Sequence, residues 1–228
     1  MKYIVVGLGS FGASLAEKLT EEGNEVIGID TNMNKVDNYK ERITHTICMD
    51  ATDEFTVSGL PLSGTDMVVV AIGEDKGANV MATALFKNLQ VKRLISRAID
   101  GLHEKVLHAI GVDEIVHPEE ESAERWAKKL CLKGVVDSFE LSESYSIVEV
   151  NVPTRFDGKT IRETNVRENY NLLVLTTITN TEEKSFVGKT RSVTKVKGVA
   201  SPNNILSKDD ILVVYGANKD IKRFLKDD

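Results

Sequence analysis

Short apolar runs alternate with amphipathic stretches through the first half of the chain. Residues 3–6, 26–29 and 67–72 are continuous runs rich in β-branched side chains, as in strands that are buried on both faces of a sheet. Apolar residues at helical spacing over 11–19 and 78–89 predict helices between these strands. Weaker patterns predict further strands at residues 44–49, 94–98 and 114–116, and further helices at 34–42, 55–60 and 102–110. Strands that alternate with helices over short connections predict a doubly wound parallel sheet.

A glycine-rich turn follows the first predicted strand and leads into a helix. The turn consists of Gly7, Leu8, Gly9, Ser10, Phe11 and Gly12. Glycines at this spacing allow a tight turn, close approach of the backbone to a phosphate, and close packing of the helix on the sheet. The helix N-terminus adds free N–H groups and a positive dipole end. Asp30 ends the second strand. In dinucleotide-binding units, an acid at about this separation from the glycine turn accepts hydrogen bonds from the ribose hydroxyls. Together these features predict a nucleotide site; the alternative is a turn kept for packing, with Asp30 an ordinary strand end.

The second half of the chain has a different pattern. An amphipathic helix is predicted between Pro118 and Gly134, and residues 137–145 are polar, as in a linker. Beyond them, strands are predicted at residues 146–152, 172–178 and 211–216, with a short helix at 160–169. We therefore expect an α/β fold: a Rossmann-like doubly wound parallel sheet over residues 1–136, including the crossover helix, followed by a small α+β domain over residues 137–228.

The carboxyl ends of the other predicted strands meet at the same edge of the sheet, where ligands of such folds bind. Two of these ends supply further candidates, which are Asp50, Ala51, Thr52, Ala71, Ile72, Gly73 and Glu74. Asp50 or Thr52 is placed to hydrogen-bond an adenine edge, and the backbone at residues 71–73 to pass under the ribose; the alternative is that both are loop caps. Arg97 ends the fifth strand, where it either binds phosphate bidentately or pairs with a neighbouring carboxylate.

Three consecutive acids, Glu119 to Glu121, lie at the start of the helix that follows Pro118. The helix dipole by itself favours acids at this position, and a divalent cation with several carboxylate ligands is the alternative. The apolar stripe of this helix includes Trp126 and Leu130. It is wide enough to pack against another subunit, and packing inside the chain is the alternative.

The charge and the apolar runs of the chain argue against nucleic-acid-binding, membrane-spanning and secreted proteins. A net charge of −6 and a pI near 5.4 argue against the basic face that nucleic-acid-binding proteins normally carry, so no nucleic-acid partner is expected. The apolar run at residues 67–72 is far shorter than the ~20 residues that span a bilayer. The N-terminus has the pattern of a strand and not of a signal peptide. We therefore expect a cytoplasmic protein.

The chain lacks the groups that an enzyme of this fold would need. A dehydrogenase requires a second domain that brings a substrate and an acid or base to the cofactor. Residues 146–228 contain neither histidine nor cysteine, and the four histidines earlier in the chain form no recognisable catalytic spacing. We expect nucleotide binding without turnover, as in a sensor; a small NAD-dependent oxidoreductase is the alternative function. A redox-sensing transcriptional regulator would need a basic helix-turn-helix, which the charge and the C-terminal pattern do not supply.

Several motifs together resemble the RCK domain, the regulator of potassium conductance. They are residues 7–12, Asp30, and the segments 49–54, 71–75 and 110–119. The C-terminal part resembles the RCK C-terminal (TrkA-C) domain through residues 158–163, 169–171 and 202–216. The order of units is similar to that of the peripheral subunits of Trk and Ktr potassium transporters, and the resemblance covers nearly the whole chain.

This resemblance implies a regulatory subunit, not an enzyme. Such subunits assemble as homo-oligomers, from a dimer to an octameric ring, at the inner face of the cell membrane beneath a potassium-translocating subunit of the Trk or Ktr type. Binding of ATP/ADP or NAD(H) changes the shape of the ring and gates the pore. By the resemblance, residues 7–12 hold phosphates, Asp30 the ribose, residues 50–52 the adenine, Gly73 and Glu74 the pocket rim, and Arg97 a phosphate. Glu119 matches an acid that takes part in Mg²⁺ or Ca²⁺ binding between subunits in some Ktr-type rings.

Two positions depart from the family pattern. Ser10 stands where many Ktr-type members carry an arginine, which removes a charge able to contact a terminal phosphate and leaves selectivity for ATP open. Asp209-Asp210 stands where the family usually has Gly-Asp. Some C-terminal domains of this type bind cyclic di-AMP, and the match here is too partial to imply that ligand.

Overall fold

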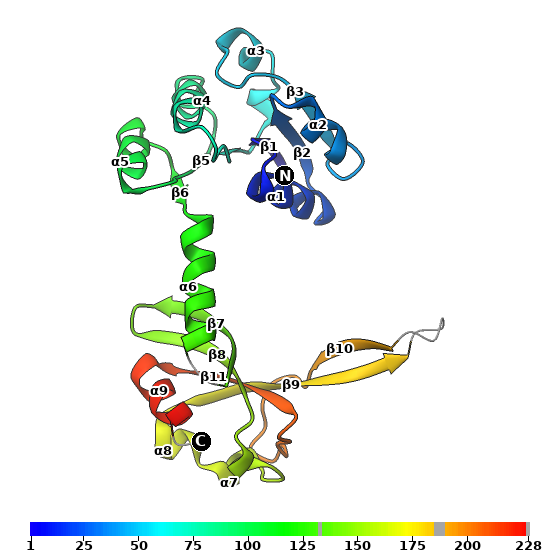
Figure 1. Ribbon diagram of the computed structural model, residues 1–228, viewed down its shortest axis with the longest axis vertical. Helices are drawn as coiled ribbons and strands as arrows, with labels where there is room; N and C mark the ends of the chain where they lie inside the picture. The colour runs from blue at the N-terminus through cyan, green and yellow to red at the C-terminus, as the bar shows by residue number, and fades with distance from the viewer. Residues whose placement is uncertain (132–133, 185–189, 227–228) are drawn as a thin grey trace. The chain divides into compact units, whose positions relative to one another are not determined.

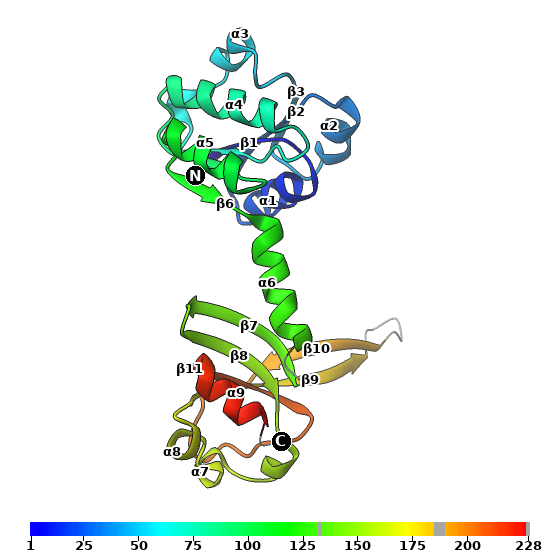
Figure 2. The same ribbon diagram turned by 60° about the vertical axis from the view of Figure 1, so that its left-hand side comes forward.

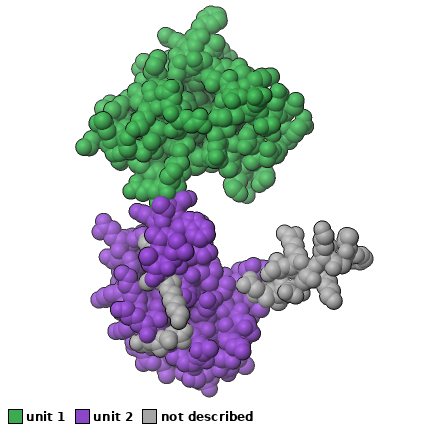
Figure 3. Space-filling view, in the orientation of Figure 1, with its two compact units in different colours: residues 1–120 green, residues 121–228 purple. Residues whose placement is uncertain are grey.

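The structure is a computed structural model and describes residues 1–131, 134–184 and 190–226 (Figure 1). Its contacts divide the chain into two compact units, Met1–Glu120 and Glu121–Asp228, drawn in different colours in Figure 3. The boundary after residue 136 that the sequence predicts lies beyond this division and stays a prediction. Within the described residues, no helix combines the length and the apolar character needed to cross a lipid bilayer.

The first unit, coloured from blue to green in Figure 2, is built on a six-stranded parallel sheet. Its strands are β1 (Lys2–Val6), β2 (Glu25–Asp30), β3 (His45–Cys48), β4 (Met67–Val70), β5 (Leu94–Arg97) and β6 (Glu114–Val116). Their spatial order is β3-β2-β1-β4-β5-β6, the Rossmann order, so the doubly wound parallel sheet predicted from the sequence is confirmed. The strand order reverses between β1 and β4, and ligands of such sheets bind at the carboxyl ends beside this reversal.

Helices cover both faces of this sheet, because alternate side chains of each strand point to opposite faces. The helices are α1 (Ser10–Glu21), α2 (Met33–Tyr39), α3 (Glu54–Ser58), α4 (Lys76–Asn88) and α5 (Gly101–Ile110), with a 3₁₀ turn, η1, at Leu62–Gly64. Ile4 of β1 belongs to the core cluster that contains Phe86 of α4. Its neighbour Val5 belongs to the cluster that contains Ala16 of α1. A continuous apolar strand is thus buried on both sides.

The second unit contains a five-stranded antiparallel sheet of order β10-β9-β11-β8-β7. Its strands are β7 (Val135–Ser142), β8 (Tyr145–Asn151), β9 (Leu173–Lys184), β10 (Thr190–Val196) and β11 (Asp210–Ala217). The helical elements are α6 (Pro118–Cys131, which begins in the first unit), η2 (Thr154–Phe156), α7 (Ile161–Thr164), α8 (Val166–Tyr170) and α9 (Asn218–Lys226). One core cluster joins Val150 and Leu212 of the sheet to Phe224 of α9. The small α+β architecture expected here is therefore present.

Three local predictions in this unit were wrong. Residues 137–145, expected as a linker, form most of β7 and its turn into β8. Their polar composition is tolerated because β7 is an edge strand. The single helix expected at residues 160–169 is two short helices, since Asn165 between them has a φ of 47°. The strand expected at residues 172–178 continues as β9 to Lys184, and β10, which was not predicted, pairs with it.

Candidate nucleotide-binding site

A cavity of about 730 Å³ lies at the carboxyl ends of β1, β2, β4 and β5. Its volume is within the range of small-molecule and cofactor sites. Fourteen of the sixteen residues predicted from the sequence line it, namely Gly7, Gly9, Ser10, Phe11, Asp30, Asp50, Ala51, Thr52, Ala71, Ile72, Gly73, Glu74, Arg97 and Glu119. The other two, Leu8 and Gly12, do not. The edge of the sheet chosen by sequence reasoning is therefore hollowed as expected.

The glycine turn has the geometry that its spacing predicts. Gly7 has a φ of 95°, a conformation that favours glycine. A Cβ on Gly12 would lie 2.0 Å from the Gly7 carbonyl oxygen, so the helix packs against the turn too closely for any side chain. A Cβ on Gly9 would meet nothing within 4 Å, because that position faces the open cavity. Gly12 therefore serves the fold, and Gly9 leaves room for a ligand.

Helix α1 points its N-terminus at the cavity. Gly9 is its N-cap residue and has no side chain to accept from the first N–H groups of the helix. Ser10 and Phe11, in the first turn, line the cavity. Unsatisfied N–H groups and the positive end of the helix dipole make this turn suited to a phosphate.

Asp30, at the end of β2, is the most buried of the acids that line the cavity. Its carboxylate accepts hydrogen bonds from the Leu8 N–H at 2.8 Å and from the Asn32 N–H at 2.8 Å. The residue is only 9% exposed, and yet it lines the cavity. A carboxylate has about four lone-pair positions, so two such bonds leave acceptor capacity for ribose hydroxyls. Leu8 itself has its side chain in the core and contributes its backbone N–H.

Lys35 also lines the cavity, and sequence reasoning missed it. Its Nζ lies 3.8 Å from Asp30 Oδ2 and 3.6 Å from Glu74 Oε1, so one ammonium group faces the ends of both β2 and β4. Asn32 caps α2 by accepting from the Asn34 N–H, which places Lys35 in the first turn of that helix. A lysine five residues after a strand-end acid was the only available signal, and charged residues are common at such positions.

Asp50 and Thr52 form a compact turn after β3. The Thr52 N–H and hydroxyl both donate to Asp50 Oδ1, at 2.9 and 2.7 Å. These bonds, the backbone one first, hold the pKa of the Asp50 carboxyl below its usual value, with a smaller opposing effect of burial. The carboxylate therefore stays ionised at neutral pH, and the turn presents it at the cavity wall.

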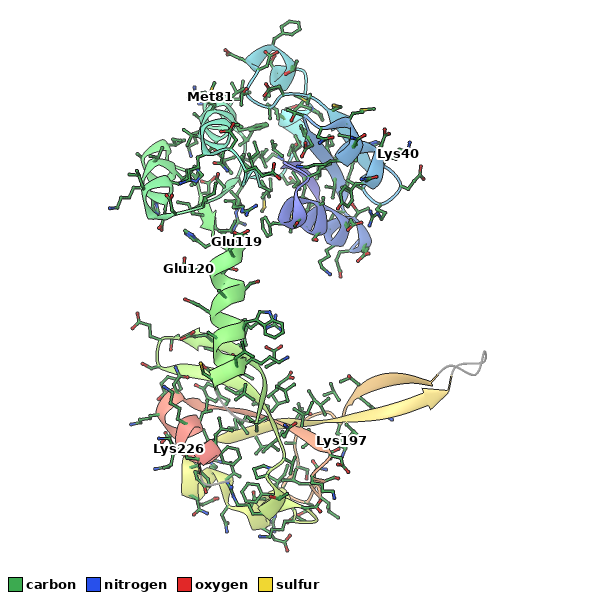
Figure 4. The ribbon with its side chains drawn as sticks, viewed as in Figure 1. Lys40, Met81, Glu119, Glu120, Lys197 and Lys226 are labelled. Carbon is green, nitrogen blue, oxygen red and sulfur yellow. The ribbon has the colours of Figure 1, made fainter. Side chains whose placement is uncertain are left out.

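The guanidinium of Arg97 lies close against Gly73 in the cavity wall. A Cβ on Gly73 would come within 2.3 Å of Arg97 Nη1, so only glycine permits this position of the guanidinium. Nη1 also donates to the Ala71 carbonyl at 3.4 Å. Nη2 pairs with Glu119, in the first turn of α6, which Figure 4 labels. Of the two roles considered for Arg97, the described pairing is the one with a carboxylate.

Glu119 is the residue predicted to bind a metal ion. Its side chain is largely exposed beside the cavity and pairs with Arg97. Over residues 1–131, 134–184 and 190–226, no group of three or more histidine, cysteine, aspartate or glutamate residues is arranged to hold a metal ion.

Comparison with known families gives one match for the first unit. The model of the TrkA-N domain matches residues 3–118. This stretch contains the glycine turn, Asp30 and Arg97.

Two curated relatives match nearly the whole chain. Ktr system potassium uptake protein C of Bacillus subtilis (strain 168) is 35% identical over 227 residues, which cover 99% of this chain and 96% of the relative. Ktr system potassium uptake protein A of the same organism is 33% identical over 223 residues, which cover 98% and 95%. The similarity to these two relatives therefore extends over both units of this chain and over nearly the full length of each relative.

Solved structures agree on the fold. The crystal structure of the GsuK RCK domain superposes with a TM-score of 0.65 at 17% identity, covering 99% of this chain and 46% of that chain. The GsuK channel bound to NAD superposes with a TM-score of 0.63 at 17% identity, covering 98% and 39%. Both likenesses include the second unit.

Proposed function

The chain belongs to the TrkA-N domain family, and we propose that it is the nucleotide-binding regulatory subunit of a potassium uptake system. The observation that carries this proposal is the cavity at the carboxyl ends of β1, β2 and β4, in which the N-terminus of α1 faces Asp30. The relatives that match nearly the full chain are potassium uptake proteins of the Ktr system. Both units of the chain are accounted for by that similarity.

The ligand we propose is an adenine nucleotide, ATP/ADP or NAD(H). Its phosphates lie at the first turn of α1, its ribose on Asp30, and its base near Asp50 and Thr52. A carboxylate at the ribose position accepts free 2′ and 3′ hydroxyls and repels a 2′-phosphate, so NADP is disfavoured. Among proteins of similar fold, the GsuK channel has been solved with NAD bound.

The ion pair between Arg97 and Glu119 links the cavity to helix α6, so a bound ligand can change the position of that helix. Arg97 lines the cavity, and Glu119 belongs to the first turn of α6, the helix that leads into the second unit. A phosphate that reaches Arg97 competes with Glu119 for the same guanidinium. A nucleotide thereby favours one arrangement of the start of α6 over another, which is the differential affinity that any ligand-driven change requires.

We propose that this change acts within a homo-oligomeric ring on a membrane potassium-translocating subunit of the Trk or Ktr type. The ring is peripheral at the cytoplasmic face of the membrane and binds its ligand without turning it over. The uptake systems to which the relatives belong support this assignment. Residues 146–228 carry neither histidine nor cysteine for acid–base or nucleophilic chemistry, which favours a sensor over an oxidoreductase.

We further propose that Glu119 contributes one ligand to a Mg²⁺ or Ca²⁺ ion. Magnesium in nucleotide sites is usually held by one or two carboxylates together with phosphate oxygens and water. Thermal melting with and without each ion tests this metal site. The ions should raise the melting temperature of the wild type and leave that of Glu119→Gln unchanged. A wild-type melting temperature insensitive to both ions would contradict the metal site.

The proposed function is tested by calorimetric titration of the purified chain with ATP, ADP, NADH and NAD⁺, with the oligomer mass followed in the same samples by light scattering. We expect tight binding to an oligomer whose mass or shape depends on the ligand. Binding of NAD(H) alone by a monomer, together with hydride transfer to a substrate, would instead establish the oxidoreductase. Absence of binding by the wild type would overturn both.

A further inference from the structure

Four buried polar side chains form one hydrogen-bonded network beneath the rim of the cavity. They are Asn79 and Thr83 of α4, Ser96 of β5 and His103 of α5. The first three have no exposed surface, and His103 is 4% exposed. None of the four lines the cavity. Buried polar groups at this depth cost stability unless they are satisfied, so an extended network calls for a structural reason.

The Asn79 amide joins the ends of two neighbouring strands. Its Nδ2 donates to the Ile72 carbonyl at 2.9 Å and to the Arg97 carbonyl at 3.2 Å. The ladder between β4 and β5 stops at the pair formed by Val70 and Ser96, so these two carbonyls lie just beyond it. Both Ile72 and Arg97 line the cavity. One amide group therefore holds together the two strand ends that form one wall of the candidate site.

The same contacts determine the orientation of the rest of the network. Two carbonyls can only accept, so the Asn79 nitrogen must face them and its Oδ1 must face Ser96 and His103. Ser96 Oγ donates to Oδ1 at 3.1 Å, and Thr83 Oγ1 lies 2.9 Å from Ser96 Oγ. His103 Nε2 lies 3.1 Å from Oδ1 and must be the donor, because an amide oxygen has no proton to give.

With the proton on Nε2, the neutral ring of His103 has Nδ1 as its acceptor nitrogen. Nδ1 is buried and has no hydrogen-bond partner among the described residues. Protonation would create an unpartnered N–H and a charge at this position, which is costly. Burial lowers the pKa of His103; the facing carboxylate of Asp100 opposes this and the ammonium of Lys76 adds to it. Lys76 and Asp100 are also paired with each other.

We propose that Asn79 is a positioning residue for the nucleotide site, held in place by Ser96, Thr83 and the neutral ring of His103. The inference rests on the proposed function, because it assigns these residues to the binding of the same nucleotide. Asn79 touches no ligand and acts through Ile72 and Arg97. Protonation of His103 at Nδ1 keeps the Nε2–H donor but adds a charge and an unpartnered N–H in a buried position. This cost favours displacement of the ring away from Asn79, which reduces nucleotide affinity in mildly acidic solution.

The first test measures nucleotide affinity by calorimetry at pH 7.5 for Asn79→Ala, Ser96→Ala and Thr83→Val. The matched control is Thr65→Val. It removes a buried hydroxyl that donates to the Pro61 carbonyl just before the amino end of β4, away from the cavity. We expect Asn79→Ala to weaken binding about tenfold and the two milder variants about threefold, with the control within twofold of wild type. Ser96→Ala and Thr83→Val keep the test decisive if Asn79→Ala does not fold. Network variants that bind like the control would overturn the proposal.

The second test follows affinity between pH 7.5 and 5.5 for the wild type and for His103→Gln. Glutamine keeps an N–H donor for Asn79 and does not titrate. We expect wild-type affinity to fall more steeply than that of His103→Gln; any titration of the nucleotide itself affects both equally. Parallel pH profiles would overturn the role of His103. A wild type that binds no nucleotide even at pH 7.5 would contradict the proposed function, whereas normal binding with unaffected variants contradicts only the positioning role.

Discussion

The backbone N–H of Leu8 donates a hydrogen bond to Oδ2 of Asp30 over 2.8 Å, in a buried position. This bond joins the glycine turn after β1 to the carboxyl end of β2, the two parts of the chain that we assign to phosphate and ribose. The acid is therefore oriented by the turn before any ligand arrives. Such preorganisation reduces the entropy that binding must otherwise offset.

Replacing Asp30 with alanine should weaken nucleotide binding by more than tenfold without unfolding the protein. The ribose loses its acceptor, and the buried Leu8 N–H loses its partner, which costs about 1–3 kcal/mol of stability. Calorimetry measures the first effect and urea unfolding the second. Asp37→Ala, which removes an acid of α2 that pairs with Lys40, is the control. Unchanged affinity would remove Asp30 from the site.

Alanine at Gly9 and at Gly12 should have opposite consequences. Gly12→Ala places its Cβ against the Gly7 carbonyl and should destabilise the first unit by about 2 kcal/mol or more. Gly9→Ala meets no neighbour and should keep the wild-type melting temperature while losing most nucleotide affinity, because the methyl group occupies the phosphate position. Normal nucleotide binding by Gly9→Ala would place the phosphates elsewhere.

Neutralising Lys35 should weaken the binding of phosphorylated ligands about three- to tenfold at low salt. Its ammonium group lies between Asp30 and Glu74 at the cavity, where it offsets their negative charge toward an anion. Lys40→Met is the matched control, since Lys40 lies just beyond the same helix and does not line the cavity (Figure 4). Affinities of Lys35→Met and wild type should converge as salt screens the charge. A difference that persists at high salt would contradict an electrostatic role.

Acidification should destabilise the protein through His103. Its pKa in the folded state is lowered from 6.5, first by burial, so the unfolded chain binds more protons between that lowered value and pH 6.5. The stability associated with the neutral ring is complete above pH 6.5 and decreases as the pH falls below it. Urea unfolding at pH 7.5 and 5.5 should show a larger loss for the wild type than for His103→Gln. Equal losses would show that the ring is protonated without cost.

Replacing Trp126 with glutamate should lower the oligomer mass. Trp126 is 57% exposed on α6 although it is large and apolar, as expected of a side chain that another subunit covers. Light scattering measures the mass, and Phe55→Glu, at an exposed aromatic of α3, is the control. A monomeric wild type would rule out the ring.

Local patterns in the sequence were sufficient to predict the strands and helices of the first unit and most of the residues that line its cavity. The apolar runs of β1, β2 and β4 and the spacing of Gly7, Gly9 and Gly12 act over a few residues, so they are legible without the fold. Once the strands are predicted, the residues at their carboxyl ends are also known. Parallel strands bring these ends together at one edge of the sheet. In the second unit the same approach missed β7 and β10, because a polar edge strand lacks the apolar run on which the prediction depends.

In the first unit, the sequence by itself determined the order of strands and helices along the chain, the glycine turn and the acid at the end of β2. Only the tertiary structure decided that Lys35 faces Asp30, that Arg97 pairs with Glu119, and that Asn79 joins the ends of β4 and β5. The physical reason is the separation along the chain of the residues that interact. Turns, strand runs and helix faces are set by neighbours in the chain, whereas partners of charged and buried polar groups are set by elements that meet only after the chain has folded.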